Sequence, residues 1–360
     1  MERVVELVLR SHPGARVLSP DFAESNVPDA ERPQWLARVE PFAVRGERRR
    51  PLWAPRYARR IARAPIDATD LVLSFSGHGW SLAATPPAGA PHVTYATGLP
   101  RSLYDEFGRY VSAEPFVMRP LLRAALPLLR ADSARRARRP DRVLTVSQAS
   151  ADAFAAGYGI AAEVLHPPVR TDFFTPAPRA RRHVLVVGRL VNHKRIDVAI
   201  EAARLAGLPV VVAGAGRRLE ALRARAGNHA TFTGWVDDDR LRELYRESVA
   251  CVCPSVEEFG IVMAEAQACG IPVVAPRAGG ALDIVQDGVT GRLAEDRSAA
   301  GLAEALRDLP DDPAACRAAG ARFSEERFIH ALDDVLAQEL GQLARRAPRS
   351  PLHAPAAALR

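Results

Sequence analysis

The chain has few of the residues that usually mark metal sites, disulfide scaffolds or membrane spans. It holds four cysteines in 360 residues, with no Cys-x-x-Cys pair and no Cys/His spacing typical of zinc. No apolar run reaches the ~20 residues that a spanning helix needs, and residues 1–10 carry too much charge for a signal peptide. These absences predict a reducing, cytoplasmic location and no structural metal.

Aromatic residues are also scarce, at 6% of the chain. Together with the absence of any DNA- or RNA-binding module, this argues against a nucleic-acid partner. The hydrophobic fraction of 48% and the charged fraction of 25% are ordinary for a soluble globular protein. A chain of this length predicts two or three domains.

Lysine is nearly absent: 48 of the 49 basic residues are Arg, and the single Lys is Lys194. Surface charge in this chain is therefore supplied by Arg. A single Lys in that background indicates a position where a compact ammonium group suits better than a planar guanidinium. Chance is the alternative.

The positive charge is divided unevenly along the chain. Residues 1–170 hold 24 basic and 17 acidic side chains, whereas residues 171–360 hold 25 of each. The densest stretch, 119–142, predicts an amphipathic Arg-rich helix that Pro127 interrupts. Such a helix favours contact with an anionic membrane, which would place the protein at the inner face of the plasma membrane. An ordinary surface helix is the alternative.

Strand and helix patterns alternate through the second half, which predicts a doubly wound parallel sheet. Strands are expected at 183–187, 209–213, 249–253 and 272–275, and helices at about 194–206, 216–226, 239–247 and 260–269. The first half alternates less regularly, with strands expected at 71–75, 92–95, 142–146 and 162–165.

The expected organisation is α/β, with two Rossmann-like domains facing each other across a cleft. Residues 1–168 form the first domain and 169–330 the second, and the proline-rich stretch 166–182 links them. A helix at 331–343 and a disordered tail at 344–360 follow. The chain opens in a helical pattern, so the first domain is expected to lack its first strand and Gly-rich turn. A misplaced start codon is the alternative.

Two cations follow the strand at 183–187. Gly188, Arg189 and Lys194 lie at the carboxyl end of this strand, where open α/β sheets bind ligands. Arg grips two oxygens and Lys acts as a point charge, a pair that suits a diphosphate. Two solvated cations are the alternative.

Two carboxylates follow the strand at 249–253. Glu257 is expected in a loop and Glu265 in the next helix, with Phe259, Gly260, Ile261 and Val262 between them. Carboxylates suit sugar and ribose hydroxyls because they accept bidentate hydrogen bonds. Acidic residues favoured by the helix dipole are the alternative reading.

Tight glycine turns and one acidic run accompany these residues. Gly279-Gly280 and Gly214-Ala215-Gly216 follow strands and let a backbone approach a phosphate closely. Val236 is placed near a nucleotide base. The Asp-x-Asp in Asp237-Asp238-Asp239 is interpreted as a helix start rather than a metal site.

Six motifs follow one another in the second half: VVGRL…HK, GxG, TGWV, EEFGIVMAEAQACGIPVV, AGG and DGVTGRL. Their order resembles glycosyltransferase family 4, the retaining enzymes of GT-B fold. The resemblance spans roughly 165–330, and Glu257 and Glu265 fill both ends of the family's E-x7-E motif. The first half is similar more loosely, through VTYATGLPRSLYD and DRVLTVSQASADAF. The segments EEFGIVMAEAQA and HKRIDVAIEA look most like those of mannosyltransferases of surface polysaccharide assembly.

The resemblance implies a role for each matching residue. Arg189 and Lys194 would neutralise the leaving diphosphate, Glu257 would contact the transferred sugar, and Glu265 would hold the ribose. These roles make Arg189, Lys194 and Glu257 the catalytic candidates. The donor-binding candidates are Gly188, Arg189, Lys194, Gly214, Gly216, Val236, Glu257, Phe259, Gly260, Ile261, Val262 and Glu265. No metal or other cofactor is implied, because the two cations would supply the charge stabilisation.

The acceptor side departs from the family. Thr97 stands where members often carry a His, and His78, Thr97 and Arg101 are the acceptor-side candidates. The expected function is retaining, metal-independent transfer of a hexose, with mannose from GDP-mannose favoured, to a glycan or lipid-linked acceptor. A non-catalytic subunit that binds a sugar nucleotide is the alternative.

Overall fold

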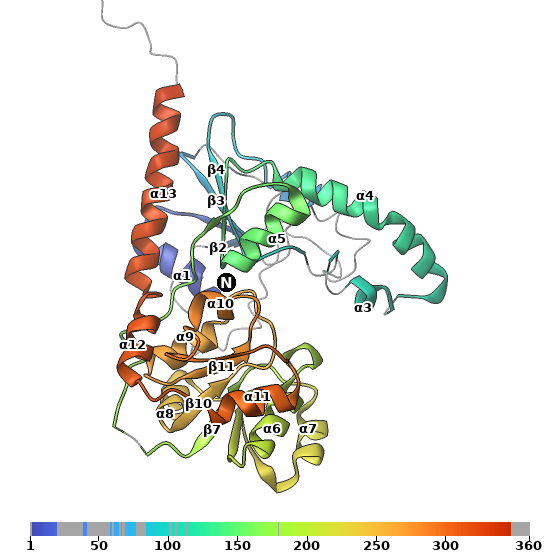
Figure 1. Cartoon of the computed structure of the whole chain (residues 1–360). Helices are drawn as coiled ribbons and strands as arrows, with labels where there is room; N and C mark the ends of the chain where they lie inside the picture. Colours follow the sequence, from blue (N-terminus) through green and yellow to red (C-terminus); the bar gives the residue numbers. More distant parts are fainter. Residues whose placement is uncertain are drawn as a thin grey trace, which may run out of the picture.

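Two α/β lobes make up the protein, and they stack one above the other (Figure 1). The structure, a computed structural model, describes residues 2–19, 39–41, 58–59, 61–64, 66, 69–76, 84–100, 103–104, 107–112, 114–178 and 180–346. We call the lobe around strands β3–β6 the N-lobe and the lobe around strands β7–β12 the C-lobe. His78 and Arg101 lie outside the described residues.

The C-lobe is a six-stranded parallel sheet in the order β12-β11-β10-β7-β8-β9. Its strands are β7 (His183–Val187), β8 (Val210–Ala213), β9 (Ala230–Gly234), β10 (Ser248–Val252), β11 (Val273–Pro276) and β12 (Gly291–Ala294). The doubly wound sheet predicted for the second half is therefore confirmed. Strands β9 and β12 were not predicted.

Helices cover both faces of this sheet because successive strand residues point to opposite sides. Val184 and Val186 of β7 face the core beneath α6 and α11, while Leu185 between them faces the core that α9 shares. The helices are α6 (Ile196–Leu205), α7 (Leu219–Ala226), α8 (Asp238–Arg246), α9 (Ile261–Ala268), α10 (Ala281–Ile284), α11 (Ala299–Arg307) and α12 (Pro313–Ala321). Burial on both faces explains the near-continuous valine runs.

The N-lobe sheet has the parallel order β3-β4-β5-β6, and a separate parallel pair joins β1 to β2. The strands are β1 (Val17–Ser19), β2 (Val39–Pro41), β3 (Val72–Ser76), β4 (His92–Ala96), β5 (Arg142–Thr145) and β6 (Glu163–Val164). The helices are α1 (Glu2–Ser11), α3 (Phe107–Ser112), α4 (Arg119–Ala137) and α5 (Gln148–Tyr158). Helix α1 confirms the helical opening.

Helix α4 runs through Pro127 without a break, so the predicted interruption was wrong. A proline inside a helix removes one backbone hydrogen bond at a cost of about 3 kcal/mol. Buried residues on both sides of it, Leu122 towards one end and Ser133 and Ala137 towards the other, hold the two halves in line. Among the described residues, no helix combines the length and apolar character that crossing a bilayer requires.

The C-terminal helix is longer than predicted, because α13 runs over Glu325–Arg346 rather than 331–343. It leaves the C-lobe and returns along the N-lobe (Figure 1), where Phe328 packs edge-on against Tyr95 of β4. Buried apolar residues before residue 331 start the helix early. Residues 347–360 lie outside the described part of the chain.

The stretch between the lobes is partly packed rather than a free linker. Val169 and Phe174 are buried, and Val169 forms a β-bridge with Ser324. The chain crosses from one lobe to the other beside the start of α13, which fixes the two lobes against a common support.

Candidate functional site

A cavity of about 370 Å³ lies where the two lobes meet. Its size falls within the range of small-molecule sites. The lining residues come from both lobes: Val4, Tyr95, Thr97, Val146, Pro167, Val187, Lys194, Ile196, Cys253, Pro254, Ser255, Glu257, Glu258, Phe259, Gly260, Ile261 and Val262. Among the described residues, its charged side chains are Lys194, Glu257 and Glu258.

Lys194 reaches the cavity from the turn after β7. That turn ends in a short 3₁₀ segment, Asn192–Lys194, and Arg195 follows in the left-handed region with φ of 50°. The loop after β8 supports the turn from behind. A Cβ atom on Gly214 would lie 2.0 Å from the Gly188 carbonyl oxygen, so this contact requires glycine.

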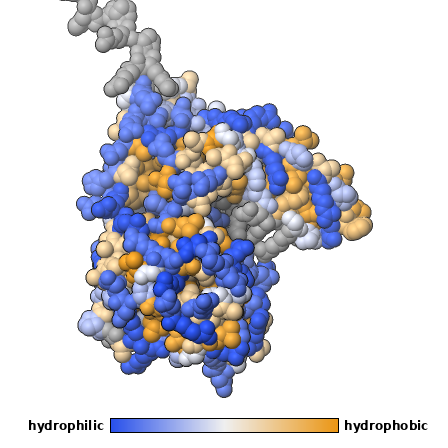
Figure 2. Space-filling model, viewed as in Figure 1, coloured by the Kyte–Doolittle hydropathy of each residue, from blue (hydrophilic) through white to orange (hydrophobic). Residues whose placement is uncertain are grey.

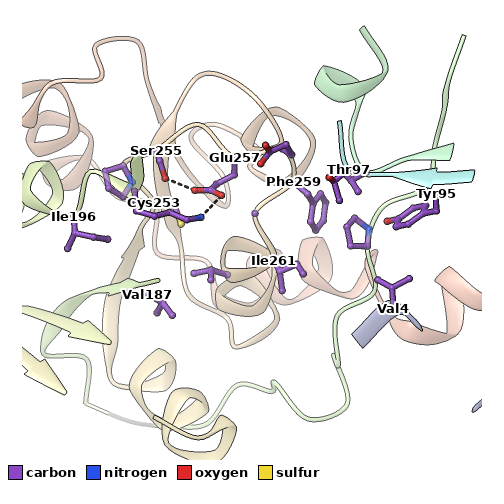
Figure 3. Close-up of a pocket in the computed structure, with 17 residues that line it drawn as sticks. Val4, Tyr95, Thr97, Val187, Ile196, Cys253, Ser255, Glu257, Phe259 and Ile261 are labelled. Atoms are coloured by element: carbon purple, nitrogen blue, oxygen red, sulfur yellow. Dashed lines mark hydrogen bonds and ion pairs between the residues drawn. The ribbon is translucent and has the colours of Figure 1, made fainter. Parts of the chain in front are cut away.

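Lys194 and Glu257 form an ion pair inside the cavity (Figure 3). The Lys194 Nζ atom donates to Glu257 Oε2 at 2.6 Å, and the Ser255 hydroxyl donates to Glu257 Oε1 at 2.5 Å. Both carboxylate oxygens are therefore held from the C-lobe. Lys194 and Glu257 stay partly exposed, so a ligand in the cavity can reach both groups.

The Gly279-Gly280 turn supports the Glu257 loop. The Gly280 N–H donates to the Glu257 carbonyl oxygen at 2.9 Å, and a Cβ on Gly280 would lie 2.2 Å from the Phe259 carbonyl oxygen. The helix that follows, α10, has only four residues. The structure thus packs this glycine pair against the loop, and the predicted approach of its backbone to a phosphate stays a prediction.

Glu265 lies one helical turn beyond Ile261 on α9, outside the cavity wall. Its side chain is 5% exposed. The Tyr245 hydroxyl donates to Oε2 at 3.0 Å, and Arg3 Nη1 donates to Oε1 at 3.2 Å. Burial raises the pKa of Glu265 to about 7, although the Arg3 charge acts in the opposite direction.

Three polar contacts close the lobes around the cavity. The Ser147 hydroxyl donates to the Glu258 carbonyl oxygen at 2.5 Å. The Gln148 N–H donates to Asp283 Oδ2 at 2.7 Å, and His166 Nε2 lies 3.1 Å from the same oxygen. The first contact joins the N-cap of α5 to the loop that carries Glu257, and the other two join Gln148 and His166 to Asp283 on α10.

The structure brings some of the predicted donor-binding residues to the cavity and leaves others outside it. Those that line it are Lys194, Glu257, Phe259, Gly260, Ile261 and Val262, and Thr97 lines it from the N-lobe. Those outside its wall are Gly188, Arg189, Gly214, Gly216, Val236 and Glu265. Arg189 is exposed. Of the two predicted cations, Lys194 lines the cavity and Arg189 does not. Of the two predicted carboxylates, Glu257 lines it and Glu265 does not.

Sequence reasoning missed the N-lobe wall and Ser255. Tyr95 is the last residue but one of β4 and Val146 follows β5, so both lie at carboxyl ends of parallel strands. That position is the signal which could have found them. Ser255 carries a signal too, because it lies two residues before Glu257.

The acidic run at 237–239 starts a helix, as predicted. Asp237 is the N-cap of α8, and its Oδ1 accepts from the Arg240 N–H at 2.8 Å. Asp238 lies in the first turn.

Two family models match the chain. The model described as glycosyl transferases group 1 matches residues 170–325, and that described as glycosyltransferase family 4 matches residues 14–173. Curated relatives include a protein named GDP-mannose-dependent α-(1-6)-phosphatidylinositol monomannoside mannosyltransferase. The Mycolicibacterium smegmatis protein is 30% identical over 67% of this chain and 69% of its own length.

Two further relatives match over shorter spans. The Mycobacterium tuberculosis protein of the same name is 34% identical over 57% of this chain. The chain spans about three fifths of that relative's length, 62%. A D-inositol 3-phosphate glycosyltransferase of Geodermatophilus obscurus is 38% identical over 54% of this chain and 52% of its own length.

Solved structures resemble the fold over nearly the whole chain. Anabaena HepE in complex with UDP and glucose has a TM-score of 0.67 at 21% identity, covering 93% of this chain and 95% of that one. Sucrose-phosphate synthase from Thermosynechococcus elongatus has a TM-score of 0.62 at 20% identity, covering 96% and 91%. With its two parallel-sheet lobes and these matches, the chain belongs to glycosyltransferase family 4 and has the GT-B fold.

Proposed function

We propose that the protein is a retaining glycosyltransferase that moves a hexose from a nucleotide-diphosphate sugar to a glycan or lipid-linked acceptor. The Lys194–Glu257–Ser255 cluster in the interlobe cavity is the observation that carries the proposal. The names of the relatives favour mannose from GDP-mannose as the donor group. They also favour an acceptor built on inositol.

The donor diphosphate is placed against Lys194. As the bond from sugar C1 to the phosphate oxygen breaks, negative charge grows on the leaving group, and a preorganised ammonium stabilises it. Arg189 follows the same strand and is the second cation of the proposal. These two charges take the part that a divalent metal would otherwise play, so we propose transfer without metal.

Glu257 is placed against hydroxyls of the transferred sugar. Its Oε2 is bonded to Lys194, and its Oε1 is fixed by Ser255. When the ammonium turns to the diphosphate, Oε2 becomes available to a sugar hydroxyl while Ser255 keeps the carboxylate oriented. The acceptor oxygen then bonds to C1 on the face that the phosphate leaves, and its proton passes to the leaving phosphate.

The test is donor turnover with EDTA present, using GDP-mannose and UDP-sugars as probes and following release of the nucleoside diphosphate. We expect release from at least one donor, faster with a phosphatidylinositol mannoside as acceptor. Calorimetry that shows donor binding without turnover would favour the non-catalytic subunit, for which Thr97 at the acceptor side is the motivation. No binding of any donor would refute both.

We also propose contact of the segment 119–142 with an anionic membrane. Of the five most exposed large apolar side chains among the described residues, four lie at 116–128: Phe116, Val117, Leu121 and Leu128. On α4, Leu121 and Leu128 are spaced seven residues apart, with the exposed Ala124 and Ala131 at matching intervals. The outward face of α4 is thus apolar, and α4 projects from the body (Figures 1 and 2).

Arginine side chains border this apolar stripe. Arg123 is exposed beside it, and Arg135, with 78% of its side chain exposed, continues it towards the C-terminal end of α4. An apolar stripe with cationic edges suits the interface of an anionic bilayer. A nucleic acid would leave the apolar stripe unused.

Vesicle flotation tests the membrane contact. We expect the protein to float with phosphatidylglycerol-containing vesicles at low salt, and a Leu121→Ser/Leu128→Ser variant to stay in solution. Leu205→Ser on α6, also at an exposed leucine, is the matched control and should float normally. Equal recovery of the wild type on neutral and anionic vesicles would contradict the proposal.

A further inference from the structure

Helix α1 places Val4 at the cavity, on the side opposite the Lys194 cluster, and Arg3 beside the cavity wall. Val4 is buried and lines the cavity wall. Arg3, one residue before it, reaches past the wall to two acidic residues of the C-lobe, Glu265 on α9 and Asp238 on α8.

The guanidinium of Arg3 bridges the two carboxylates. Its Nη1 donates to Glu265 Oε1 at 3.2 Å, while its Nη2 donates to both oxygens of Asp238, at 2.9 and 3.0 Å. Asp238 is held in turn by Arg170, whose Nη2 donates to Oδ2 at 2.5 Å. Arg3 therefore joins α1 to two C-lobe helices at once, and its two partners lie 262 and 235 residues away in the sequence.

Little of the Glu265 carboxylate is open to a further partner while Arg3 is in place. Its side chain is 5% exposed, and each of its oxygens already accepts a hydrogen bond. Of its two donors, Tyr245 is fully buried in the core, whereas the Arg3 side chain is 47% exposed. A ribose hydroxyl that approaches Glu265 must therefore displace Arg3 rather than Tyr245.

We propose that Arg3 sets donor affinity by competing with the donor ribose for Glu265, so that donor binding releases this contact between the lobes. The inference rests on the proposed function, because it takes as the donor's ribose partner Glu265, the carboxylate to which the family resemblance assigns that role and which lies just outside the cavity wall. Its consequence is that the apparent dissociation constant of the donor includes the free energy of breaking the Arg3 contacts.

The experiment measures donor affinity of Arg3→Gln by calorimetry with GDP-mannose, or with whichever donor the wild type binds. Measurement at pH 9 lies well above the pKa of about 7 of Glu265 in the wild type, so this carboxylate is ionised in the protein that gives the reference affinity. We expect Arg3→Gln to bind the donor about fivefold more tightly, the upper end of the effect of a partly exposed ion pair. Asp238→Asn, which removes half of the bridge, should shift affinity in the same direction.

The matched control lies on the same helix. Arg10 also projects from α1 to an acidic residue on another helix, with Nη2 2.8 Å from Glu325 Oε2, and it does not line the cavity. Arg10→Gln should bind the donor like the wild type. Thermal unfolding of each variant shows whether it is folded, and Arg3→Lys serves as a second variant if Arg3→Gln is not. Arg3→Lys keeps the charge but cannot bridge both carboxylates, so its expected donor affinity lies between those of the wild type and Arg3→Gln.

Two results overturn the inference in distinguishable ways. If the wild type binds a donor and Arg3→Gln binds it equally or more weakly, Arg3 does not compete for the ribose site, and the proposed function stands. If neither the wild type nor any variant binds a donor, the proposed function falls and the inference falls with it.

Discussion

At the proposed sugar–phosphate end of the site, the Glu257 carboxylate is held, among the described residues, by Lys194 and Ser255 of the C-lobe. At the proposed ribose end, the Glu265 carboxylate is held by Tyr245 from its own lobe and by Arg3 from α1. The two carboxylates are eight residues apart in the chain. One is partly exposed in the cavity and the other is buried under an arginine.

This difference separates two tasks. An end built within one lobe keeps its geometry when the lobes move, which is what stabilisation of a developing charge requires. An end shared between lobes changes when they move, so it can couple ligand binding to the arrangement of the lobes. We expect substitutions at the first end to act on the chemical step and those at the second to act on affinity and on pH dependence.

The largest effect is expected from Lys194→Ala. Loss of the ammonium leaves the departing diphosphate with one preorganised donor fewer, which lowers kcat by about 10²–10³. Arg223→Ala, which removes an exposed cation on α7, is the control and should leave kcat unchanged. The assay is nucleoside diphosphate release at saturating donor. A loss of kcat below twofold would show that Lys194 does not act on the donor diphosphate. The proposed contrast between the two ends would then fail.

The ribose end is expected to differ by its response to pH. Glu265 has a pKa of about 7 in the folded protein against 4.5 for its ordinary value. Between these values the folded protein holds a proton that the unfolded chain has lost, so stability falls as pH rises from about 4.5 to 7. The expected contribution is about 3 kcal/mol at most, and Glu265→Gln should abolish it.

Urea unfolding of the wild type and Glu265→Gln between pH 5 and 8 tests this. The stability of the wild type relative to the variant should fall as pH rises, and level off above pH 7. The charged groups that face Glu265 are Arg3, Asp238 and Arg170. Parallel curves for the two proteins would show that Glu265 does not titrate there.

A smaller effect is expected from Gly280→Ala, which tests how the first end is supported. The new Cβ would lie 2.2 Å from the Phe259 carbonyl oxygen, so the loop that carries Glu257 must move. Overpacking of this kind costs about 1–3 kcal/mol. Gly341→Ala on α13 is the matched control, because its Cβ would meet nothing within 4 Å, and it should stabilise the protein slightly. Equal unfolding midpoints for Gly280→Ala and Gly341→Ala would show that Gly280 does not support the loop that carries Glu257.

The central strands were predictable from the sequence because they are buried on both faces. Strands β7, β8, β10 and β11 lie in the middle of the sheet, and their valine runs predicted their positions to within a residue. Strands β9 and β12 are the two edges of the same sheet. Their sequences, ATFTG and GRLA, mix polar and apolar residues and contain glycine, so they lack the pattern of a buried strand.

The candidate site was predictable where local geometry decides it. The strand end before Lys194 and the loop before α9 placed Lys194 and Glu257 in one cavity. The spacing between Glu257 and Glu265 predicted a second carboxylate in the same cavity. Glu265, however, lies one turn further along α9, where its side chain is buried. What covers it is Arg3, and a contact across 262 residues leaves no signal in local spacing. Pairing of this kind depends on how the lobes pack.

The smallest effect is expected from Ser255→Ala. This substitution tests how much the Ser255 hydroxyl contributes to holding the Glu257 carboxylate in place. In the proposed step the Ser255 hydroxyl holds Glu257 Oε1 while Lys194 turns to the diphosphate, so loss of this hydroxyl leaves the carboxylate free to rotate. A hydrogen bond to a charged group contributes about 1.5–3 kcal/mol, but Glu257 is partly exposed and water replaces part of it. We therefore expect kcat to fall by about tenfold with little change in donor affinity. Ser255→Thr retains the hydroxyl and should recover most of the rate. Equal losses in both variants would mean that the extra volume or the loop backbone, and not the hydroxyl, fixes Glu257.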